Sequence, residues 1–409
     1  MPLLTHDDIV GVAADLLSKR FGGSQQLTDV QQLSGSGSAI VLRARVAPSP
    51  FLQQRSVILK YVPVTGELLD DAALIREIVS YQFTTSLSEV VRPGPVLLAH
   101  DVAQRIIVIT DSGDGDTFSD LLETDNGERR VNILRNLGTA LGRMHSGTAQ
   151  REHDFEILLT RMLRTHPDFG EIQRLRDTAL LESITIGEQL LRNAGFDIPD
   201  LVSTFAADGR HRLLAAHHRA FTPFDLSPDN IIVAEKTHFL DYEWAGFRDV
   251  SFDLACVIAG FPQFVFSHPI SDDEADVFVE AWVHEVSQLW PNVTNESHLH
   301  SRVVAALLGW ALSSVALMEF GSLSGAAAVL HLENGDFDAE SMETDGRLLR
   351  PGNHGPFARE ELLVRRDMYE TFEALARYAA RGTDPSYGVI AAFAREVADR
   401  VAEPGLPGY

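Results

Sequence analysis

The first 110 residues combine short runs of alternating apolar and polar residues with two stretches of helical periodicity. Alternation is typical of half-buried strands, whereas apolar residues three or four positions apart indicate a helix with one buried face. Strands are predicted over residues 40–46, 56–62, 96–99 and 106–110. Helices are predicted over residues 7–21 and 70–86. The first two strands are expected to pair across a proline-bounded loop, so this part of the chain should form a small sheet.

Beyond residue 116 the pattern becomes mainly helical. Helices are predicted over residues 130–145, 271–289, 303–320 and 362–381, and short strands over 231–233 and 238–240. Ser271 and Glu274 have the spacing of a capping box, which satisfies free N–H groups at the start of a helix. The segment 111–116, in which glycines alternate with acidic residues, is the best candidate for a linker. It divides the chain into predicted domains of residues 1–112 and 113–409.

The composition is ordinary for a globular protein, with 409 residues and 45% hydrophobic residues. Cys256 is the single cysteine, so no intramolecular disulfide can form, and a reducing cytoplasm is the expected location. The N-terminal residues lack a basic region ahead of a long apolar run, so no signal peptide is expected. The longest apolar stretch, 303–318, is interrupted by Ser313 and Ser314 and is shorter than a membrane span. No membrane segment is therefore predicted.

The charge balance is strongly acidic and restricts the class of partner. The chain has 34 Lys and Arg against 58 Asp and Glu, a net charge of −24. Such a surface repels phosphate backbones, so nucleic-acid binding is not expected, whereas cationic small molecules are favoured partners. Lysine is rare: only Lys19, Lys60 and Lys236 occur among so many arginines. A lysine in a chemically useful position therefore carries extra weight.

Three features of the first domain suit phosphate binding. The turn LSGSGSAIVL has small residues whose backbone N–H groups can approach phosphate oxygens, although the same pattern also forms ordinary hairpin turns. Its candidate binding residues are Ser34, Gly35, Ser36, Gly37 and Ser38. Lys60 ends the apolar strand SVILK, and Glu77 lies in a predicted helix 17 residues later. A carboxylate in that place can hold the lysine extended toward a nucleotide.

Two motifs of the second domain carry the stronger signal. In FTPFDLSPDNIIV, Asp225 lies five residues before Asn230, a tight spacing that brings a proton-accepting carboxylate and an amide oxygen together. In HFLDYEWAGFRDVSFDLA, Asp241 directly follows an apolar strand, where a carboxylate can bind the Mg²⁺ that bridges phosphates. Both aspartates could be ordinary turn residues, but the order of all five features favours phosphoryl transfer.

These spaced motifs resemble the aminoglycoside phosphotransferase-like family of small-molecule kinases, of the choline kinase type. The family's catalytic loop reads H-G-D-x-x-P-x-N and its metal segment D-W-E-x-A-x-x-G-D-P-x-x-D-L-A. The matching residues here are Asp225, Pro228, Asn230, Asp241, Glu243, Ala245, Asp249, Asp253, Leu254 and Ala255. ITDSGDGDTFSDLL is similar to the interlobe hinge, and LGTALGRMHS to the helix that ends in L-x-x-L-H. The resemblance spans about residues 30–260.

The resemblance implies an α+β, bilobal, protein-kinase-like fold with a small antiparallel-sheet N-lobe and a larger, mainly helical C-lobe. It implies ATP and Mg²⁺ between the lobes, with Asp225 as catalytic base and Lys60 paired with Glu77. The Mg²⁺ ligands would be Asn230 and Asp241. Backbone groups near Thr110, Asp111 and Ser112 would hold adenine.

The chain departs from the family pattern on both sides of the catalytic aspartate. Pro223 and Phe224 replace the family's His-Gly, and these changes are expected to alter how the loop packs. Tyr242 replaces the family's Trp, and Arg248 and Val250 replace the Gly and Pro of Gly-Asp-Pro. The charged and amide groups assigned to catalysis are all retained, so activity is expected.

Other functional classes fit less well. A protein kinase would need a longer activation segment than the 11 residues between Asp241 and Asp253, and an A-P-E triplet. A dinucleotide-binding G-x-G-x-x-G fails because Ile40 occupies the last glycine position. His211, His217 and His218 lack the carboxylate pattern of a metal hydrolase and are expected to be surface or packing residues. A module that binds nucleotide without catalysis remains the alternative from another class.

The predicted function is ATP-dependent phosphorylation of a hydroxyl group on a small molecule, preferably a cationic amino sugar or aminoglycoside. A neutral sugar or an amino alcohol, and a catalytically weak pseudokinase, remain open. The acceptor is expected to bind in the variable helical regions 152–212 and 272–373. A predicted loop over 334–356 favours a cation through its acidic residues, Asp336, Asp338, Glu340, Glu343 and Asp345. The oligomeric state is not predicted.

Overall fold

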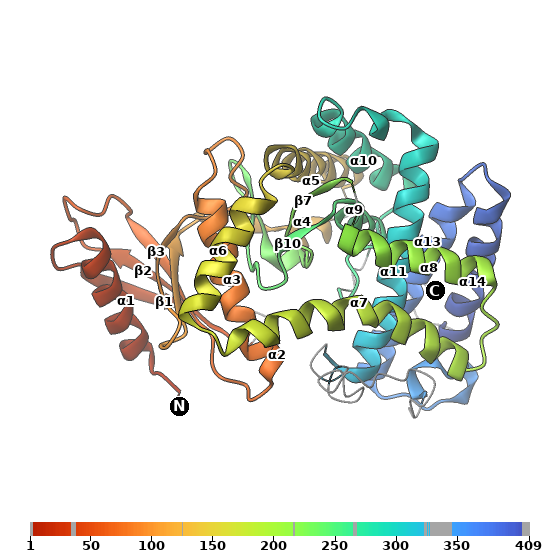
Figure 1. Cartoon of the computed structure of the whole chain (residues 1–409), viewed down its shortest axis with the longest axis horizontal. Coiled ribbons are helices and arrows are strands. Elements are labelled where there is room, and N and C mark those ends of the chain that lie inside the picture. Colours follow the sequence, from red (N-terminus) through yellow and green to blue (C-terminus); the bar gives the residue numbers. More distant parts are fainter. Residues whose placement is uncertain are drawn as a thin grey trace.

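A five-stranded antiparallel sheet forms one end of the molecule in the computed structural model (Figure 1). The structure describes residues 3–33, 38–124, 126–215, 217–264, 268–322, 325, 327 and 346–402. The strands, in the spatial order β1-β2-β3-β5-β4, are β1 (Leu27–Gln32), β2 (Ile40–Val46), β3 (Ser56–Tyr61), β5 (Ile106–Thr110) and β4 (Leu97–Asp101). Helix α1 (His6–Phe21) covers one face of this sheet, and α2 (Leu68–Asp71) and α3 (Ala73–Thr85) lie between β3 and β4 in sequence.

The remainder is mainly helical and contains two small sheets. Its helices are α4 (Phe118–Leu122), α5 (Gly127–Thr148), α6 (Glu152–Thr165), α7 (Phe169–Asn193), α8 (Asp200–Ala215), α9 (Ser251–Ile258), α10 (Asp272–Val286), α11 (Glu296–Phe320), α13 (Arg359–Ala380) and α14 (Pro385–Val401). Short 3₁₀ turns lie at Pro228–Asn230, Pro291–Thr294, Arg347–Leu349 and Gly352–His354. The strands are β6 (Asp116–Thr117), β7 (Arg219–Thr222), β8 (Ile231–Val233), β9 (Thr237–Phe239) and β10 (Gly246–Asp249), paired as β10-β7 and β6-β8-β9. The predicted α+β, bilobal fold class is thereby confirmed.

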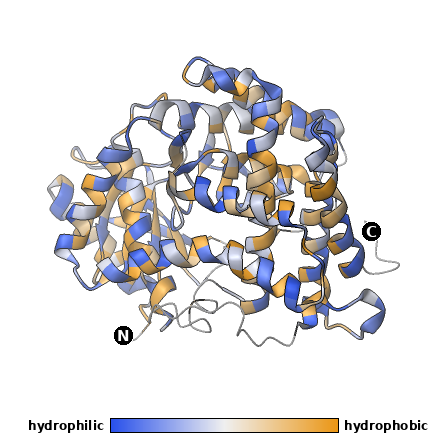
Figure 2. Ribbon diagram, turned by 45° about the vertical axis from the view of Figure 1, so that its right-hand side comes forward, coloured by the Kyte–Doolittle hydropathy of each residue, from blue (hydrophilic) through white to orange (hydrophobic). Residues whose placement is uncertain are grey.

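The buried apolar residues form two cores. A small core lies between α1 and the outer face of the sheet, where Ile9, Ala13 and Leu17 of α1 recur at helical spacing and are fully buried. A large core joins α3 to the helices of the C-lobe. In Figure 2 the ribbon segments in the middle of the helical part are mostly apolar, and hydrophilic segments are more frequent toward its outside. Helix α3 therefore packs with the C-lobe although its sequence lies between N-lobe strands.

Helix α11 is the centre of the large core. It extends seven residues before the predicted start at Val303, and it is long and apolar enough by length and composition to cross a membrane. The helix is therefore longer than the predicted 303–320, because the residues from Glu296 onward continue it. Inside the protein, 78% of its apolar window is buried, which is the behaviour of a core helix.

Two further expectations need correction. The predicted helix 70–86 is interrupted at Ala72, where α2 ends and α3 begins. Strand β1 was not predicted, because its sequence LTDVQQ is polar and largely exposed, so it lacks the apolar alternation of a half-buried strand. The capping box of Ser271 and Glu274 is confirmed at the start of α10.

Candidate active site

Lys60 lies where the two cores meet. Side chains alternate along β3, so Val57, Leu59 and Tyr61 enter the small core while Lys60 points to the opposite face, toward α3. Its ammonium Nζ donates to Glu77 Oε1 at 2.8 Å and to Asp241 Oδ1 at 2.8 Å. The predicted contact between Lys60 and Glu77 is thus present, and the same lysine also reaches the aspartate assigned to Mg²⁺.

Burial and charge act in opposite directions on these groups. Burial alone would lower the pKa of Lys60, but Asp241 and Glu77 outweigh it and hold the pKa well above its usual value. Burial raises the pKa of Glu77, and the charge of Asp241 adds to this, while Lys60 opposes it. The lysine is therefore firmly protonated, and it is the cation that allows two carboxylates to share one small volume.

Asp225 is presented by a tight turn. Phe224 has a φ of 67°, in the left-handed region that favours glycine, and the Asp225 N–H donates to the Pro223 carbonyl at 2.9 Å. The Asp225 carboxylate accepts a hydrogen bond from the Ser227 N–H at 3.2 Å. Burial raises the pKa of Asp225 to about 6, Asp241 adds to the effect, and the Ser227 N–H opposes it.

The bulky residue in the glycine position is held by stacking. The ring of Phe224 stacks on Trp310 with centroids 4.9 Å apart. The Arg248 guanidinium lies over the Phe224 ring, 4.7 Å from its centroid. Two departures from the family pattern, Phe224 and Arg248, therefore touch each other. Their contact explains how a residue with a side chain adopts the left-handed conformation before Asp225, because packing offsets the backbone strain.

A hairpin brings Asn230 and Asp241 to the same end of the C-lobe sheet. Asn230 precedes β8 and Asp241 follows β9, and the Leu240 N–H donates to the Asn230 carbonyl at 2.8 Å. Asp241 has a φ of 57° and a side chain that is 33% exposed, so its second oxygen is accessible. Its N–H contacts the Tyr81 hydroxyl of α3 at 3.4 Å. The two residues assigned to Mg²⁺ therefore lie side by side, Asn230 just before β8 and Asp241 just after β9.

The predicted hinge residues lie at the C-terminal end of β5, an inner strand of the N-lobe sheet. The Thr110 N–H donates to the Val96 carbonyl at 2.9 Å. Backbone N–H donors to an adenine base would therefore have to come from the residues next to Thr110. The Asp111 carboxylate accepts from Arg43 at 3.0 Å and Ser56 at 2.8 Å. Ser112 Oγ lies 2.8 Å from His238 Nδ1. Of the predicted phosphate turn, Ser38 is exposed, and Ser34–Gly37 fall outside the described residues.

A buried histidine supports the metal segment from behind. The Trp282 indole N–H donates to His145 Nδ1 at 2.9 Å, which leaves the proton on Nε2. Nε2 then donates to Asp253 Oδ2 at 3.1 Å, and both His145 and Asp253 are fully buried. Burial raises the pKa of Asp253, opposed by His145. This chain of hydrogen bonds anchors the start of α9 to α5 and α10.

The remaining candidates lie apart from this centre. His218 stacks on Trp290 with centroids 4.9 Å apart and contacts Arg302, and burial lowers its pKa to about 4. His211 and His217 are exposed. Among the described residues, no three His, Cys, Asp or Glu side chains form a cluster that could hold a metal ion by themselves.

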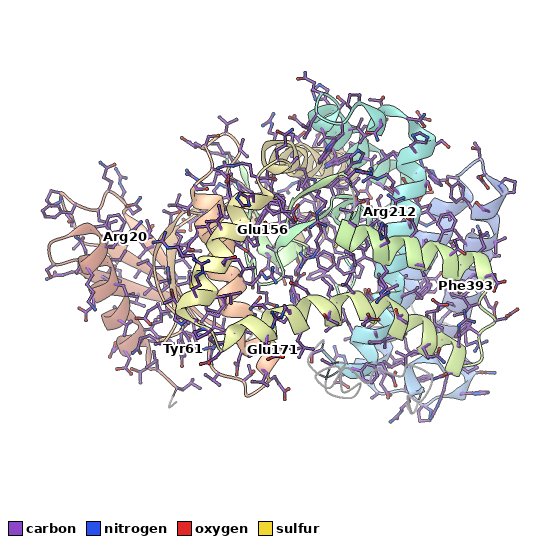
Figure 3. The ribbon with its side chains drawn as sticks, viewed as in Figure 1. Arg20, Tyr61, Glu156, Glu171, Arg212 and Phe393 are labelled. Carbon is purple, nitrogen blue, oxygen red and sulfur yellow. The ribbon has the colours of Figure 1, made fainter. Side chains whose placement is uncertain are left out.

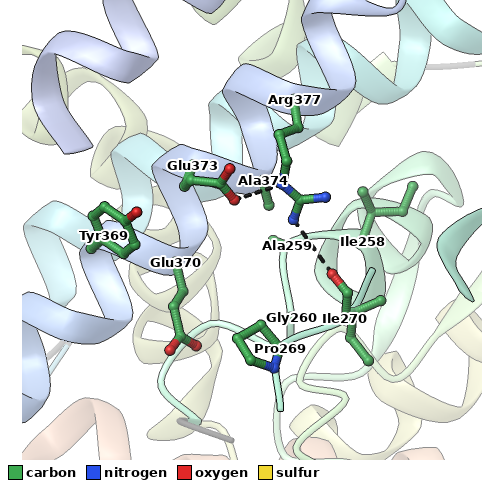
Figure 4. Close-up of a pocket in the computed structure, with 10 residues that line it drawn as sticks. All are labelled: Ile258, Ala259, Gly260, Pro269, Ile270, Tyr369, Glu370, Glu373, Ala374 and Arg377. Atoms are coloured by element: carbon green, nitrogen blue, oxygen red, sulfur yellow. Dashed lines mark hydrogen bonds and ion pairs between the residues drawn. The ribbon is translucent and has the colours of Figure 1, made fainter. Parts of the chain in front are cut away.

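A cavity of about 220 Å³ lies between the end of α9 and helix α13 (Figure 4). Figure 4 shows Glu373 and Arg377 joined across its wall, and Arg377 also reaching the Ile270 carbonyl. Among the described residues, its lining contains none of those predicted for the nucleotide, metal or base. Glu370 and Glu373, which line it, are near the end of the second predicted acceptor region.

Sequence reasoning missed a group of interlobe contacts made by α7. The Arg176 guanidinium donates to the Leu69 carbonyl at 2.8 Å and to the Glu243 carbonyl at 3.0 Å. No local pattern marks such contacts, because they depend on where α7 crosses the molecule. That helix had been assigned only to acceptor binding.

The chain matches one family model and is similar to several solved structures. A family model described as "Phosphotransferase enzyme family" matches residues 76–293, and no curated protein matches the chain. Similar solved structures include aminoglycoside phosphotransferase APH(2'')-Ib bound to ADP, at 12% identity, 76% coverage of this chain, 90% of that chain and a TM-score of 0.43. Choline kinase from Cryptosporidium parvum has 12% identity, coverages of 79% and 93%, and a TM-score of 0.45. A putative aminoglycoside phosphotransferase from Ralstonia eutropha has 11% identity, coverages of 94% and 98%, and a TM-score of 0.47.

Proposed function

The chain belongs to the phosphotransferase enzyme family, and we propose that it transfers the γ-phosphoryl group of ATP to a hydroxyl group of a small molecule. One observation carries the proposal: Lys60 Nζ lies 2.8 Å from both Glu77, 17 positions later in the chain, and Asp241, 181 positions later. A lysine held by two carboxylates at the junction of two lobes is suited to receive the phosphates of a nucleotide.

Asp225 supplies the base in this proposal. It orients the acceptor hydroxyl and accepts its proton as the oxygen attacks the γ-phosphorus and the bond to the β-phosphate oxygen breaks, releasing ADP. A pKa raised to about 6 leaves the carboxylate ionised at neutral pH while making it a better proton acceptor than a free aspartate. Lys60 lies against the transferring phosphates and balances the negative charge that develops there. Most of the rate enhancement then comes from positioning.

The donor set fits Mg²⁺. Mg²⁺ is commonly bound through one or two protein oxygens together with phosphate oxygens, and the carboxylate of Asp241 and the amide of Asn230 would provide them. The charge balance points the same way, because burial and the charge of Asp241 raise the pKa of both Asp225 and Glu243. A site with more carboxylates than cations has room for a divalent ion. When bound, the ion would neutralise the phosphates and polarise the γ-phosphoryl group.

We propose a cationic acceptor, an amino sugar or aminoglycoside. Among the described residues, no cation lies within ion-pair distance of Asp225, so an ammonium group near the acceptor hydroxyl would face a carboxylate that has no cationic partner. The net charge of −24 adds a long-range attraction that salt should screen. The acidic loop invoked from the sequence, Asp336, Asp338, Glu340, Glu343 and Asp345, lies outside the described residues. We expect the protein in the cytoplasm, without nucleic-acid or membrane partners.

A screen for acceptor-dependent ADP release tests this function. The purified protein is incubated with MgATP, and separately with MgGTP, against a panel of aminoglycosides, amino sugars, amino alcohols and neutral sugars. The expected result is ADP release that depends on a cationic acceptor and whose kcat/KM falls as ionic strength rises. Equal use of a matched neutral sugar, without salt dependence, would contradict the cationic acceptor while preserving the kinase. No acceptor-dependent release with either nucleotide would contradict the proposed function.

A further inference from the structure

Helix α7 runs along the boundary between the lobes and then far into the C-lobe (Figure 1). Figure 3 labels Glu171 near its first turn, beside α2, at the end that faces the N-lobe. Gln173, Arg176 and Asp177 follow at helical spacing, so they share one face of this first part of α7. Gln173 and Arg176 are almost completely buried. Long polar side chains are rarely buried without a specific partner, and both of these side chains have such partners.

The first set of contacts holds the helix that carries Glu77. Arg76, the residue before Glu77, donates from Nε to Gln173 Oε1 at 3.1 Å and from Nη2 to both oxygens of Asp177 at 3.0 and 2.9 Å. Gln173 in turn donates to the Ala72 carbonyl at 2.7 Å. Charge-assisted, two-pronged bonds of this kind fix orientation as well as distance.

The second set reaches the metal segment. Arg176 donates from Nη1 to the Leu69 carbonyl at 2.8 Å and from Nη2 to the Glu243 carbonyl at 3.0 Å. Its guanidinium also lies 4.0 Å from the ring centre of Trp244. One planar group thus joins α2, directly before α3, to the residues that follow Asp241. A single ammonium could not donate along both directions with the same geometry.

The third set reaches the catalytic loop. Arg248 Nη2 lies 3.8 Å from the Asp177 carboxylate, and Arg248 Nη1 donates to the Trp244 carbonyl at 2.7 Å. The same guanidinium covers the ring of Phe224, the residue before Asp225. Helix α7 is therefore connected, directly or through one side chain, to the segments that carry Glu77, Asp241 and Asp225.

We infer that α7 is the positioning element of the catalytic centre, and that Arg176 sets the Asp241 segment in register with the Glu77 helix. The inference rests on the proposed function. Arg176 touches no substrate in this role: it acts through the backbone of Leu69 and Glu243. The Arg176 guanidinium, a planar fork of N–H donors, bonds two chain segments. Loss of this fork should therefore let Asp241 move relative to Lys60 and Glu77 while the fold persists.

The test is the substitution Arg176→Lys, which keeps the charge and loses the fork. The measured quantities are kcat and the Mg²⁺ concentration that gives half the maximal rate, for the full-length protein with ATP and its best acceptor. We expect half-saturation to need about tenfold more Mg²⁺ and kcat to fall about tenfold, since loss of supporting contacts typically costs 10–100-fold in metal affinity or activity. Excess Mg²⁺ should restore part of kcat. The KM for the acceptor should stay unchanged.

Arg192→Lys is the matched control, because Arg192 lies on the same helix, is itself exposed, and donates to Glu188 and Ser203, which lie far along α7 and on α8. If the two variants show the same Mg²⁺ dependence and kcat, the inference is overturned. Should Arg176→Lys not fold, Asp177→Asn replaces it, because Asp177 is half exposed and its loss is expected to act in the same direction.

A second readout separates this inference from the proposed function. If wild-type protein turns over no acceptor, the proposed function fails, and the inference is judged by the Mg²⁺-dependent part of the ATP-induced rise in melting temperature. That part should be present in wild type and Arg192→Lys and reduced in Arg176→Lys. An equal rise in all three proteins, or none in wild type, overturns the inference.

Discussion

The two hydrophobic cores hold different parts of the catalytic centre. The small core of α1 and the sheet carries the strand of Lys60, whereas the large core carries both of its carboxylate partners, Glu77 through α3 and Asp241 through the C-lobe hairpin. Sequence order would group Glu77 with Lys60, but packing groups it with Asp241. The relative position of the two carboxylates is therefore set by helix packing, and the lysine is the group that crosses between cores.

The division between the two cores indicates which catalytic residues can move relative to one another. Close packing within one core resists displacement, so Glu77, Asp241 and Asp225 are held as a set. Movement between the lobes must instead be accommodated at Lys60. Substitutions in the large core should then alter chemistry, and substitution of Lys60 should mainly alter how nucleotide joins the lobes.

Asp225→Asn should give the largest effect. Asparagine keeps the size and loses the proton-accepting charge, so kcat should fall by about a hundredfold or more, the usual range for loss of a general base. Nucleotide binding should be retained, because Lys60 and its partners remain. The comparison is made by ADP release together with MgATP-induced thermal stabilisation. Turnover close to wild type would remove Asp225 from its assigned role.

Lys60→Met should remove the connection between the cores. In wild type, MgATP at 100 times its Kd should stabilise the fold by about 2.7 kcal/mol through mass action. Lys60→Met should lose most of this stabilisation, because the cation facing the phosphates is gone and Glu77 and Asp241 are left without it. Lys236→Met is the matched control, since Lys236 is exposed and its ammonium pairs with the exposed Glu89. Equal stabilisation of both variants would contradict the bridging role.

The contact of α7 with α11 inside the large core is open to a smaller test. A Cβ added at Gly187 would lie 1.8 Å from the Leu312 carbonyl oxygen, whereas nothing lies within 4 Å of one added at Gly11 of α1. Gly187→Ala should therefore destabilise the fold by about 1–3 kcal/mol through overpacking. Gly11→Ala should stabilise it by about 0.5–1 kcal/mol, because alanine favours a helix. Chemical denaturation measures both, and stabilisation by Gly187→Ala would refute the close helix contact.

The pH dependence of the acceptor kcat/KM tests Asp225 as the base without changing any residue. A base acts only when deprotonated, so with a pKa raised to about 6 the acceptor kcat/KM should be constant at neutral pH and fall below about pH 6. The decline should approach tenfold per pH unit. A rising limb near pH 4, the ordinary range of an aspartate, would show that Asp225 is not held in the buried environment described here.

Much of the fold followed from local pattern. Strands β2 and β5 were predicted to the residue, because their apolar runs are bounded by turn residues. The break at Ala72 was not predicted, because the contacts made there are remote in sequence: Gln173 donates to the carbonyl of Ala72, and Arg176 donates to the carbonyl of Leu69. Local sequence cannot show a partner a hundred positions away.

The candidate site divides in the same manner. Lys60, Asp225 and Asp241 were found because each follows or precedes an apolar strand in a motif of fixed spacing. Arg176 of α7 and Arg248 of β10 were not assigned catalytic roles, because an arginine in a helix or strand is ordinarily a solvated residue and only the tertiary arrangement gives it partners. The catalytic groups are local motifs, whereas the residues that align them belong to the packing of α7.

The most direct test of the account is to follow the acceptor itself by mass spectrometry during the reaction with ATP. With wild-type protein, the acceptor should gain one phosphoryl group for each ADP formed, and Asp225→Asn should give almost no product. ADP formed together with free phosphate, at a rate indifferent to any acceptor, would contradict it.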